Sequence, residues 1–294
     1  MKLAAIDIGS NAIRLLINRI WQTEEGVKVI KESLIRVPVR LGEVSFTTGH
    51  IGLQKEKKLI KTFKAFKNLM DIYEVEDFMV CATSAMREAD NHKDIIKRVE
   101  EKTGIHIDVI DGKTEAELIL STMSLQKLEL QGDYLYIDVG GGSTEISYIK
   151  NGVPKKSKSF KIGTVRLLKN KVEPQAWQRM SKWIADEVET IDANNLIAIG
   201  TGGNINKLFK LAGIVGTKVI KTSQLQETVD LVNSLTYDQR IEQLSLKPDR
   251  ADVIIPASNI YMHVLNQVGI KKMIVPKVGL SDGMILKLFK ELNN

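Results

Sequence analysis

Cysteine is nearly missing from this chain, because Cys81 is the only one among 294 residues. A single thiol excludes an internal disulfide framework and is typical of a protein in a reducing, cytoplasmic compartment. Since Met79 and Val80 precede it, Cys81 is interpreted as a buried strand residue rather than a reactive thiol. No hydrophobic run approaches the roughly 20 apolar residues that span a bilayer, and the N-terminus is predicted to be a strand instead of a signal peptide. We therefore expect a cytoplasmic protein without a membrane partner.

Aromatic residues are also scarce, at 5% of the chain, and dense basic runs are absent. Because nucleic-acid-binding proteins combine basic surfaces with stacking aromatics, no specific nucleic acid is expected as a partner. The formal net charge of +6 still favours anionic partners. The richest lysine cluster follows a predicted turn and comprises Lys155, Lys156, Lys158 and Lys161. It has two interpretations: a solvated strand edge, where lysines discourage strand pairing, or the border of a cleft for a long anion.

Histidine gives no metal site either. The chain has four histidines without a shared spacing and without cysteine companions, namely His50, His92, His106 and His263. Neither a zinc site nor a Ser-His-Asp arrangement is expected from them.

What the chain does have is one plan of strands and helices that occurs twice. The first half has predicted strands at 2–8, 13–20, 27–37, 78–82 and 106–110, with helices from Leu53, over 91–103 and over 114–125. The second half repeats this pattern from a strand at 134–138. We therefore expect an α/β fold with an N-terminal lobe over 1–128 and a C-terminal lobe over 129–294. The boundary is placed at Leu128–Asp133, and the last helix, about 281–294, could pack back on the first lobe. Two lobes would leave a cleft, a common place for ligands.

Matching glycine turns occupy the same place in each half. Asp7-Ile8-Gly9-Ser10-Asn11 ends the first strand, and Asp138-Val139-Gly140-Gly141-Gly142-Ser143 ends its counterpart. Glycine lets the backbone come close to a ligand, and a concavity of N–H groups suits a phosphate anion. The aspartate beside each turn can hold a divalent cation, which prefers oxygen ligands. Two such turns facing each other would hold a polyanionic substrate and its metal.

An ordered set of motifs extends these turns and identifies a family. The motifs are IDIGSNAIRLLI, ATSAMREADN, DGKTEAELI, IDVGGGSTEIS, IGTVRLL and IGTGGNINKL. From about Leu3 to Lys287 the chain resembles the exopolyphosphatase and guanosine-pentaphosphate phosphohydrolase family, within the actin, sugar-kinase and heat-shock-chaperone ATPase superfamily. The resemblance implies two ribonuclease-H-like lobes around a central cleft. It also implies a short, two-domain member, because many relatives add a further helical region.

The resemblance assigns the catalytic and metal-binding roles. Glu115 matches the glutamate that orients and deprotonates water, and Asp138 and Glu145 match the pair that holds Mg²⁺ or Mn²⁺. Asp7 is the counterpart of Asp138 and is a third candidate ligand, or else a residue that stabilises its own turn. From the residues alone, Glu115 is equally understood as a first-turn carboxylate favoured by the helix dipole. Glu117 stays open as an alternative base.

Phosphate binding is assigned by the same resemblance to both turns and to three further positions. These residues are Ser10, Asn11, Gly140, Gly141, Gly142, Ser143, Arg87, Gly202 and Gly203. The glycine triplet could instead be a tight hairpin, and Arg87 could form a salt bridge with Glu88 or Asp90. Arg14 and Arg166 are weaker candidates that could brace a turn.

The expected activity is hydrolysis of terminal phosphoanhydride bonds of inorganic polyphosphate, with short chains preferred because no further helical region follows. The alternatives are a guanosine pentaphosphate (or tetraphosphate) phosphohydrolase, a weakly catalytic sensor of polyphosphate or alarmone, and an ATP-dependent kinase. A homodimer is expected by analogy with relatives.

Overall fold

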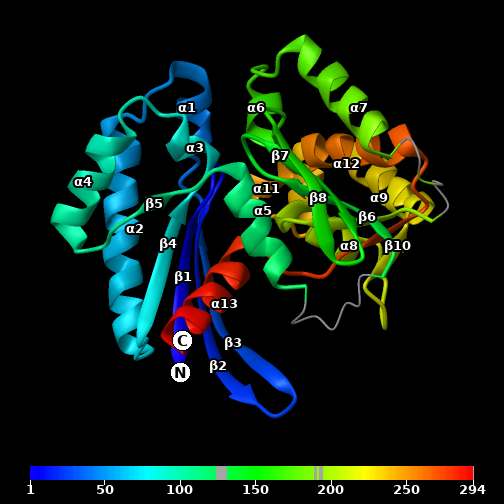
Figure 1. The fold of residues 1–294 in the computed structure, drawn as a ribbon. Coiled ribbons are helices and arrows are strands. Elements are labelled where there is room, and N and C mark those ends of the chain that lie inside the picture. Colours follow the sequence, from blue (N-terminus) through cyan, green and yellow to red (C-terminus); the bar gives the residue numbers. More distant parts are fainter. Residues whose placement is uncertain (124–130, 189–190, 192–194, 294) are drawn as a thin grey trace. The chain divides into compact units, whose positions relative to one another are not determined.

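The structure of the protein is a computed structural model that describes all residues except 124–130, 189–190, 192–194 and 294 (Figure 1). Its contacts group the chain into unit 1, Met1–Leu128 with Gly279–Asn294, and unit 2, Glu129–Val278. The boundary predicted at Leu128–Asp133 falls largely on residues outside the described ones. Among the residues with described positions, no helix has the length and apolar character that crossing a membrane requires.

Unit 1 is built on a mixed sheet with the strand order β3-β2-β1-β4-β5. The strands are β1 (Lys2–Ile8), β2 (Ile13–Thr23), β3 (Gly26–Val37), β4 (Asp77–Ala82) and β5 (Asp108–Val109). β1 pairs antiparallel with β2 and parallel with β4, so it is the central strand, and all its residues except Lys2 are buried. The near-continuous apolar run of β1 is what burial on both faces requires. Its carboxyl end therefore delivers Asp7 and the first glycine turn to an edge of the sheet.

The helices of unit 1 include one that comes from the far end of the chain. They are α1 (Gly42–Thr48), α2 (Leu53–Ile72), α3 (Ser84–Arg87), α4 (His92–Thr103), α5 (Gly112–Ser121) and α13 (Leu280–Leu292). Figure 1 shows α13 in red beside α5 and β1, and these are its main contacts. A Cβ at Gly283 of α13 would lie 2.1 Å from the carbonyl oxygen of Leu118 in α5. The two helices can approach this closely because that position has no side chain.

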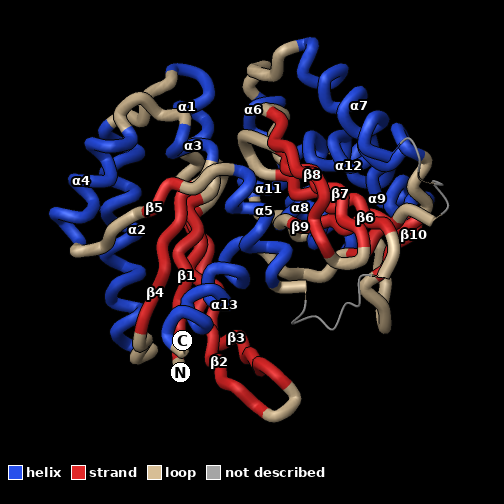
Figure 2. The backbone as a smooth tube through the Cα atoms, viewed as in Figure 1, coloured by secondary structure: helices blue, strands red, loops and turns tan. Residues whose placement is uncertain are grey.

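Unit 2 repeats the sheet of unit 1 and adds one edge strand. Its order is β10-β11-β9-β6-β7-β8, in which β8-β7-β6-β9-β11 corresponds to β3-β2-β1-β4-β5 (Figure 2). The strands are β6 (Asp133–Val139), β7 (Thr144–Lys150), β8 (Val153–Phe160), β9 (Ile197–Thr201), β10 (Val219–Lys221) and β11 (Lys272–Ile274). The central strand is now β6, antiparallel to β7 and parallel to β9. The predicted duplication and the α/β fold class are confirmed.

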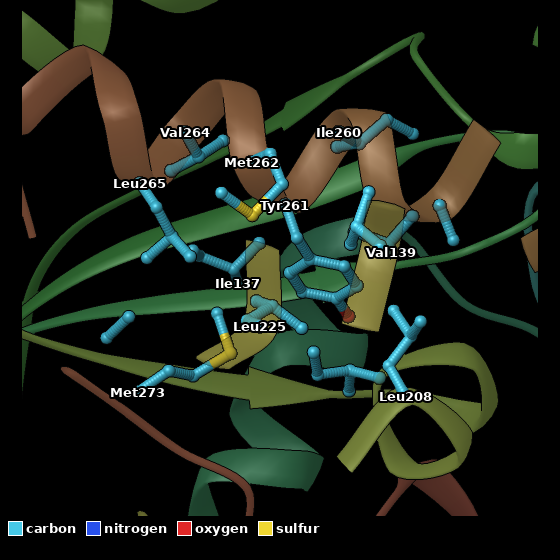
Figure 3. Close-up of a cluster of buried hydrophobic side chains, with 14 of the residues drawn as sticks. Ile137, Val139, Leu208, Leu225, Ile260, Tyr261, Met262, Val264, Leu265 and Met273 are labelled. Atoms are coloured by element: carbon cyan, nitrogen blue, oxygen red, sulfur yellow. The ribbon is translucent and has the colours of Figure 1, made fainter. Parts of the chain in front are cut away.

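The helices of unit 2 are α6 (Thr164–Leu168), α7 (Pro174–Val188), α8 (Gly203–Leu211), α9 (Thr222–Ser234), α10 (Tyr237–Glu242), α11 (Pro248–Ala251) and α12 (Ile254–Val268). Of these, α7, α8, α9 and α12 contact the sheet of the unit, and α6 and α11 contact α12. Figure 3 shows Tyr261 of α12 among Ile137, Leu208 and Met273, in the core of the unit. The Tyr261 hydroxyl donates a hydrogen bond to the carbonyl of Thr201, as a buried phenol requires. This bond fixes the carboxyl end of β9.

The main departures from the predicted elements are short helices. α1 and α3 were not predicted, because each is shorter than two turns and too short to show a helical apolar period. The strand predicted over 106–110 is reduced to Asp108–Val109. The helix predicted over 114–125 begins at Gly112 and ends at Ser121, with residues 124 and 125 outside the described ones.

Candidate functional site

The first glycine turn is held by the segment that begins α1. The Ser10 carbonyl accepts from Gly42 N–H at 2.8 Å, and the Asn11 carbonyl accepts from Arg40 N–H at 3.0 Å. In a planar trans peptide the N–H of the next residue points opposite to the carbonyl. The N–H groups of Asn11 and Ala12 therefore point away from 40–42, as a pair of donors suited to an anion.

Asp7 is the next-to-last residue of β1, just before this turn, and its carboxylate forms an ion pair with an arginine. It is opposite Arg14 in the β1–β2 register, and Arg14 Nη1 lies 2.6 Å from Asp7 Oδ2. The Asp7 side chain is 5% exposed and that of Arg14 is 34% exposed, so the carboxylate is buried while the guanidinium reaches the surface. Arg14 thus braces the turn by neutralising its aspartate.

A chain of contacts connects the first turn with the start of α5. The hydroxyls of Ser10 and Ser84 are 3.0 Å apart, which fixes the turn to α3. Arg87, the last residue of α3, donates from Nη1 to the Ile110 carbonyl at 2.6 Å. Asp111 follows and caps α5 by accepting from Thr114 N–H at 2.8 Å. The structure therefore brings Ser10, Arg87 and the first turn of α5, which carries Glu115, into one neighbourhood.

Glu115 and Glu117 have different surroundings within α5. Glu117 is exposed and pairs with Lys113 at 3.9 Å along the helix surface. Glu115 is half-buried in the first turn. Burial raises the pKa of the Cys81 thiol to about 12, and the nearby carboxylates of Asp7 and Glu115 contribute in the same direction. Glu115 therefore lies near enough to Cys81, in β4, to act on its thiol, whereas Glu117 is part of a surface ion pair.

Replacing Asp111 with alanine is expected to destabilise the protein by about 1 kcal/mol, the usual effect of losing a helix N-cap. The hydrogen bond from Thr114 holds the pKa of the Asp111 carboxyl below its ordinary value. A carboxyl group whose pKa is lowered by folding stabilises the protein at pH values above its pKa in the unfolded chain. This stabilisation is lost as the pH falls through the pKa of the folded state. Urea unfolding of wild type and Asp111→Ala at neutral and acidic pH measures both effects.

Asp111→Asn is the matched control, because asparagine caps helices as well as aspartate does. It should stay within a few tenths of a kcal/mol of wild type at neutral pH. Equal destabilisation by alanine and asparagine would show that the carboxylate charge, and not the cap, stabilises α5.

The second glycine turn is held in the same way by the start of α6. The Gly140 carbonyl accepts from Thr164 N–H at 3.0 Å, and the Gly141 carbonyl from Val165 N–H at 2.8 Å. The Gly142 carbonyl accepts from Arg166 Nε at 2.9 Å, so Arg166 also braces a turn. By the same peptide geometry, the N–H groups of Gly141, Gly142 and Ser143 point away from α6. They form a run of successive donors of the kind that binds phosphate oxygens.

Gly163 makes this arrangement possible and was not singled out by the sequence. A Cβ at Gly163 would lie 2.4 Å from the carbonyl carbon of Gly142, a contact that backbone atoms cannot relieve by a rotamer change. Gly42 has the corresponding place in unit 1, where a Cβ would lie 3.0 Å from Ser10 Cβ. The signal was present as LGEV and IGTV, an apolar residue followed by Gly-x-Val, after the third strand of each half.

Asp138 and Glu145 form a buried carboxylate pair beside the second turn. They are opposite each other in the β6–β7 register and are 8% and 3% exposed. Thr201 Oγ1 donates to Asp138 Oδ1 at 2.9 Å, and Ser159 Oγ donates to Glu145 Oε1 at 2.8 Å. Two buried carboxylates on one face of adjacent strands repel each other unless a cation lies near them. The pair corresponds in position to Asp7 and Arg14 of unit 1, where the arginine supplies the positive charge.

The donor set fits a hard divalent cation. Mg²⁺ is usually bound by one or two carboxylates and keeps water or phosphate oxygens as its other ligands. Within the described ranges, no group of three or more histidine, cysteine or acidic residues could hold a metal without such help. Asp138 and Glu145 therefore suit Mg²⁺ or Mn²⁺ bound together with a phosphate.

Gly202 and Gly203 lie at the start of α8, next to the second glycine turn. Gly202 has a φ of +105°, which favours glycine, and a Cβ there would lie 3.1 Å from Asp138 Oδ1. Gly203 begins α8, whose amino end carries N–H donors and a partial positive charge. In unit 2 the predicted residues thus converge: the glycine turn, both carboxylates and the Gly202–Gly203 turn lie together.

Known proteins resemble the chain over nearly its whole length. The model of the Ppx/GppA phosphatase family matches residues 22–292. Exopolyphosphatase 1 of Mycobacterium tuberculosis is 25% identical, over 98% of this chain and 88% of its own. A crystal structure of the Aquifex aeolicus Ppx/GppA family member is 24% identical with a TM-score of 0.77, covering 100% and 99% of the two chains. An exopolyphosphatase structure from Cytophaga hutchinsonii is 22% identical with a TM-score of 0.82, covering 99% and 98%. Both structures share the fold.

Proposed function

Since this chain belongs to the Ppx/GppA phosphatase family, we propose that it hydrolyses the terminal phosphoanhydride bond of inorganic polyphosphate and prefers short chains. The observation that carries the proposal is the second glycine turn. Its amides at Gly141, Gly142 and Ser143 point away from α6, and the buried Asp138–Glu145 pair lies beside it. Amide donors next to a carboxylate pair suit an anion that arrives with a divalent cation.

Phosphate oxygens are bound by backbone donors in this proposal. The amides of the second turn and of Asn11 and Ala12 supply hydrogen bonds, and the side chains of Ser10, Asn11 and Ser143 add to them. The amino end of α8 at Gly203 contributes its partial positive charge. Arg87, whose Nη1 donates to the Ile110 carbonyl, would offer its remaining N–H groups to the phosphate oxygens. Such preorganised donors stabilise the charge of the transferring phosphoryl group, which is the main requirement of this chemistry.

Asp138 and Glu145 would hold Mg²⁺ or Mn²⁺. The bound cation would neutralise negative charge on the phosphate oxygens. Thr201 and Ser159 orient the two carboxylates through their hydroxyl hydrogen bonds. Because Arg14 already satisfies the Asp7 carboxylate, the proposal assigns the metal to Asp138 and Glu145 and gives Asp7 the role of bracing its turn.

Glu115 acts as the general base. Its carboxylate accepts a proton from the water that attacks the terminal phosphorus, the bridging P–O bond breaks, and the shortened chain leaves with the electron pair. A carboxylate at the start of α5 suits this role because the Asp111 cap fixes that turn. Glu117, which is exposed and pairs with Lys113, is given no part in the proposal.

A phosphate-release panel tests the proposal. The substrates are pyrophosphate, tripolyphosphate, medium and long polyphosphates, guanosine pentaphosphate and ATP, each with Mg²⁺, with Mn²⁺ and with EDTA. We expect release from polyphosphate with either cation, loss of activity in EDTA, and the highest kcat/KM on short chains. Preferential cleavage of guanosine pentaphosphate or of ATP would show that the proposed substrate is wrong. Binding of polyphosphate without turnover would show that the protein is a sensor and not an enzyme.

A further inference from the structure

Two buried tyrosines hold Thr201, the residue that lies beside Asp138. Thr201 is the last residue of β9 and is the partner of Asp138 in the β6–β9 register. Its hydroxyl donates to Asp138 Oδ1 at 2.9 Å and lies 2.8 Å from the hydroxyl of Tyr136 in β6. Its carbonyl accepts a hydrogen bond from the Tyr261 hydroxyl. Thr201 and both tyrosines are fully buried, so water does not compete for these groups.

The carboxylate at the end of this set of bonds fixes the direction of the protons. An ionised carboxylate accepts hydrogen bonds and cannot donate one, whereas a hydroxyl has a single proton. Since Thr201 gives its proton to Asp138, the Tyr136 hydroxyl is the donor to Thr201. The protons therefore run in one direction along a hydroxyl row, from Tyr136 to Thr201 to Asp138. In such a row each hydrogen bond polarises the next one and strengthens it.

Tyr261 fixes Thr201 from the other face of the sheet. Its ring lies beside Ile137 in the core of unit 2 (Figure 3). Successive side chains of a strand point to opposite faces, so Ile137 points away from the face of Tyr136 and Asp138. Burial raises the pKa of Tyr261, and the negative charge of Asp138 adds to this effect. Tyr261 therefore keeps its proton and holds the Thr201 carbonyl, while the hydroxyl row holds the Thr201 side chain.

The equivalent positions of unit 1 have no such row. The residue beside Asp7 in the β1–β4 register is Cys81, which takes the place of Thr201. The residue two positions before Asp7 is Ala5, which takes the place of Tyr136. Unit 1 instead satisfies its aspartate by an ion pair with an arginine. The hydroxyl row is therefore found in the unit whose aspartate stands opposite a second carboxylate.

We propose that Tyr136 is a positioning residue of the cation site, and that through Thr201 it holds the Asp138 carboxylate in the orientation that binds a divalent cation. The inference rests on the proposed function for the presence of the cation. Carboxylates that bind metals are themselves held by hydrogen bonds, and loss of such a partner typically lowers metal affinity about 10–100-fold. A carboxylate that is already oriented loses less freedom when the cation binds.

The test removes one hydroxyl at a time. Equilibrium dialysis measures the binding of Mn²⁺ at a fixed concentration of imidodiphosphate, a pyrophosphate analogue whose bridging nitrogen replaces the hydrolysable oxygen. Thr201→Val should weaken Mn²⁺ binding by about tenfold, and Tyr136→Phe by about fivefold because it acts through Thr201. Tyr134→Phe is the matched control, since Tyr134 lies two residues earlier in β6 and donates to the Gln131 carbonyl instead. It should bind Mn²⁺ within about a factor of two of wild type.

A double variant shows whether Tyr136 acts through Thr201. If it does, Tyr136→Phe/Thr201→Val should bind Mn²⁺ within about a factor of two of Thr201→Val alone. Losses that multiply in the double variant would overturn the proposal, because the two residues would then act independently. A merely structural role would lower the urea midpoint of Tyr136→Phe and leave its Mn²⁺ affinity equal to that of Tyr134→Phe, which would also overturn it.

The same measurements separate this inference from the proposed function. If wild type binds no Mn²⁺, the assignment of a cation to Asp138 and Glu145 fails, and the role of Tyr136 fails with it. If wild type binds Mn²⁺ and the two phenylalanine variants bind it equally, the role of Tyr136 fails alone. Phosphate release gives a second readout: Tyr136→Phe should need about fivefold more Mn²⁺ for half-maximal activity and keep kcat at saturating Mn²⁺ within about a factor of two. A lower kcat with an unchanged requirement for Mn²⁺ would contradict the proposal.

Discussion

Glu115→Gln should lower kcat for phosphate release from polyphosphate by about a hundredfold to ten-thousandfold, the range over which a general base contributes. Glutamine has the size of glutamate but cannot accept the proton of the attacking water. Residual activity should remain, because the amides of both turns, and the cation that Asp138 and Glu145 would hold, still stabilise the transferring phosphate. The dissociation constant of polyphosphate should change little, since Glu115 acts on the water and not on the chain. Steady-state kinetics and calorimetry separate the two quantities.

Glu117→Gln is the matched control in the same helix. It removes the same charge two residues away, from a side chain that pairs with Lys113 on the surface. We expect kcat within a factor of about two of wild type, since exposed ion pairs contribute little. If Glu117→Gln lost activity and Glu115→Gln kept it, the assignment of the base would be reversed. If both variants kept full activity, the proposed mechanism would be wrong.

Gly163→Ala should destabilise unit 2 by several kcal/mol and abolish phosphate release. The new methyl group would lie 2.4 Å from the Gly142 carbonyl carbon and 2.5 Å from the Gly141 oxygen, far inside van der Waals contact. Overpacking a rigid site usually costs about 1–3 kcal/mol, and here both neighbours are backbone atoms. The start of α6 must move away, which breaks the hydrogen bonds that orient the amides of the turn. Urea unfolding and the phosphate-release assay report the two losses.

Gly52→Ala controls for the general effect of replacing a glycine. Gly52 has a φ of −73°, and a Cβ there meets nothing within 4 Å. It precedes α2, where alanine is a slightly poorer N-cap, so a loss of less than about 1 kcal/mol is expected. Gly163→Ala protein that unfolds like wild type and keeps its activity would contradict the role given to the tight contact between α6 and the turn.

The sequence predicted the repeated plan because both central strands are apolar, β-branched and followed by glycine turns. Contacts between distant segments were not predictable in the same way. The pairing of Gly163 with the second turn joins residues about twenty positions apart and has no local period.

The duplication also explains why the sequence suggested Asp7 as a metal ligand together with Asp138. The two aspartates end equivalent strands, so the sequence pattern treats them alike. The residue opposite each one decides its chemistry: Arg14 stands across from Asp7, and Glu145 stands across from Asp138. Pairing register, which a linear pattern does not display, is therefore the basis on which we propose different roles for Asp7 and Asp138.

The return of α13 to unit 1 has a consequence for biosynthesis. Residues 280–292 leave the ribosome after the whole of unit 2, yet Gly283 must dock against Leu118 to complete the packing of α5. Unit 2 is contiguous and can mature while translation continues, whereas the amino-terminal unit waits for a helix that is made after unit 2. The helix that carries Glu115 therefore acquires its complete packing only after unit 2 has been synthesised.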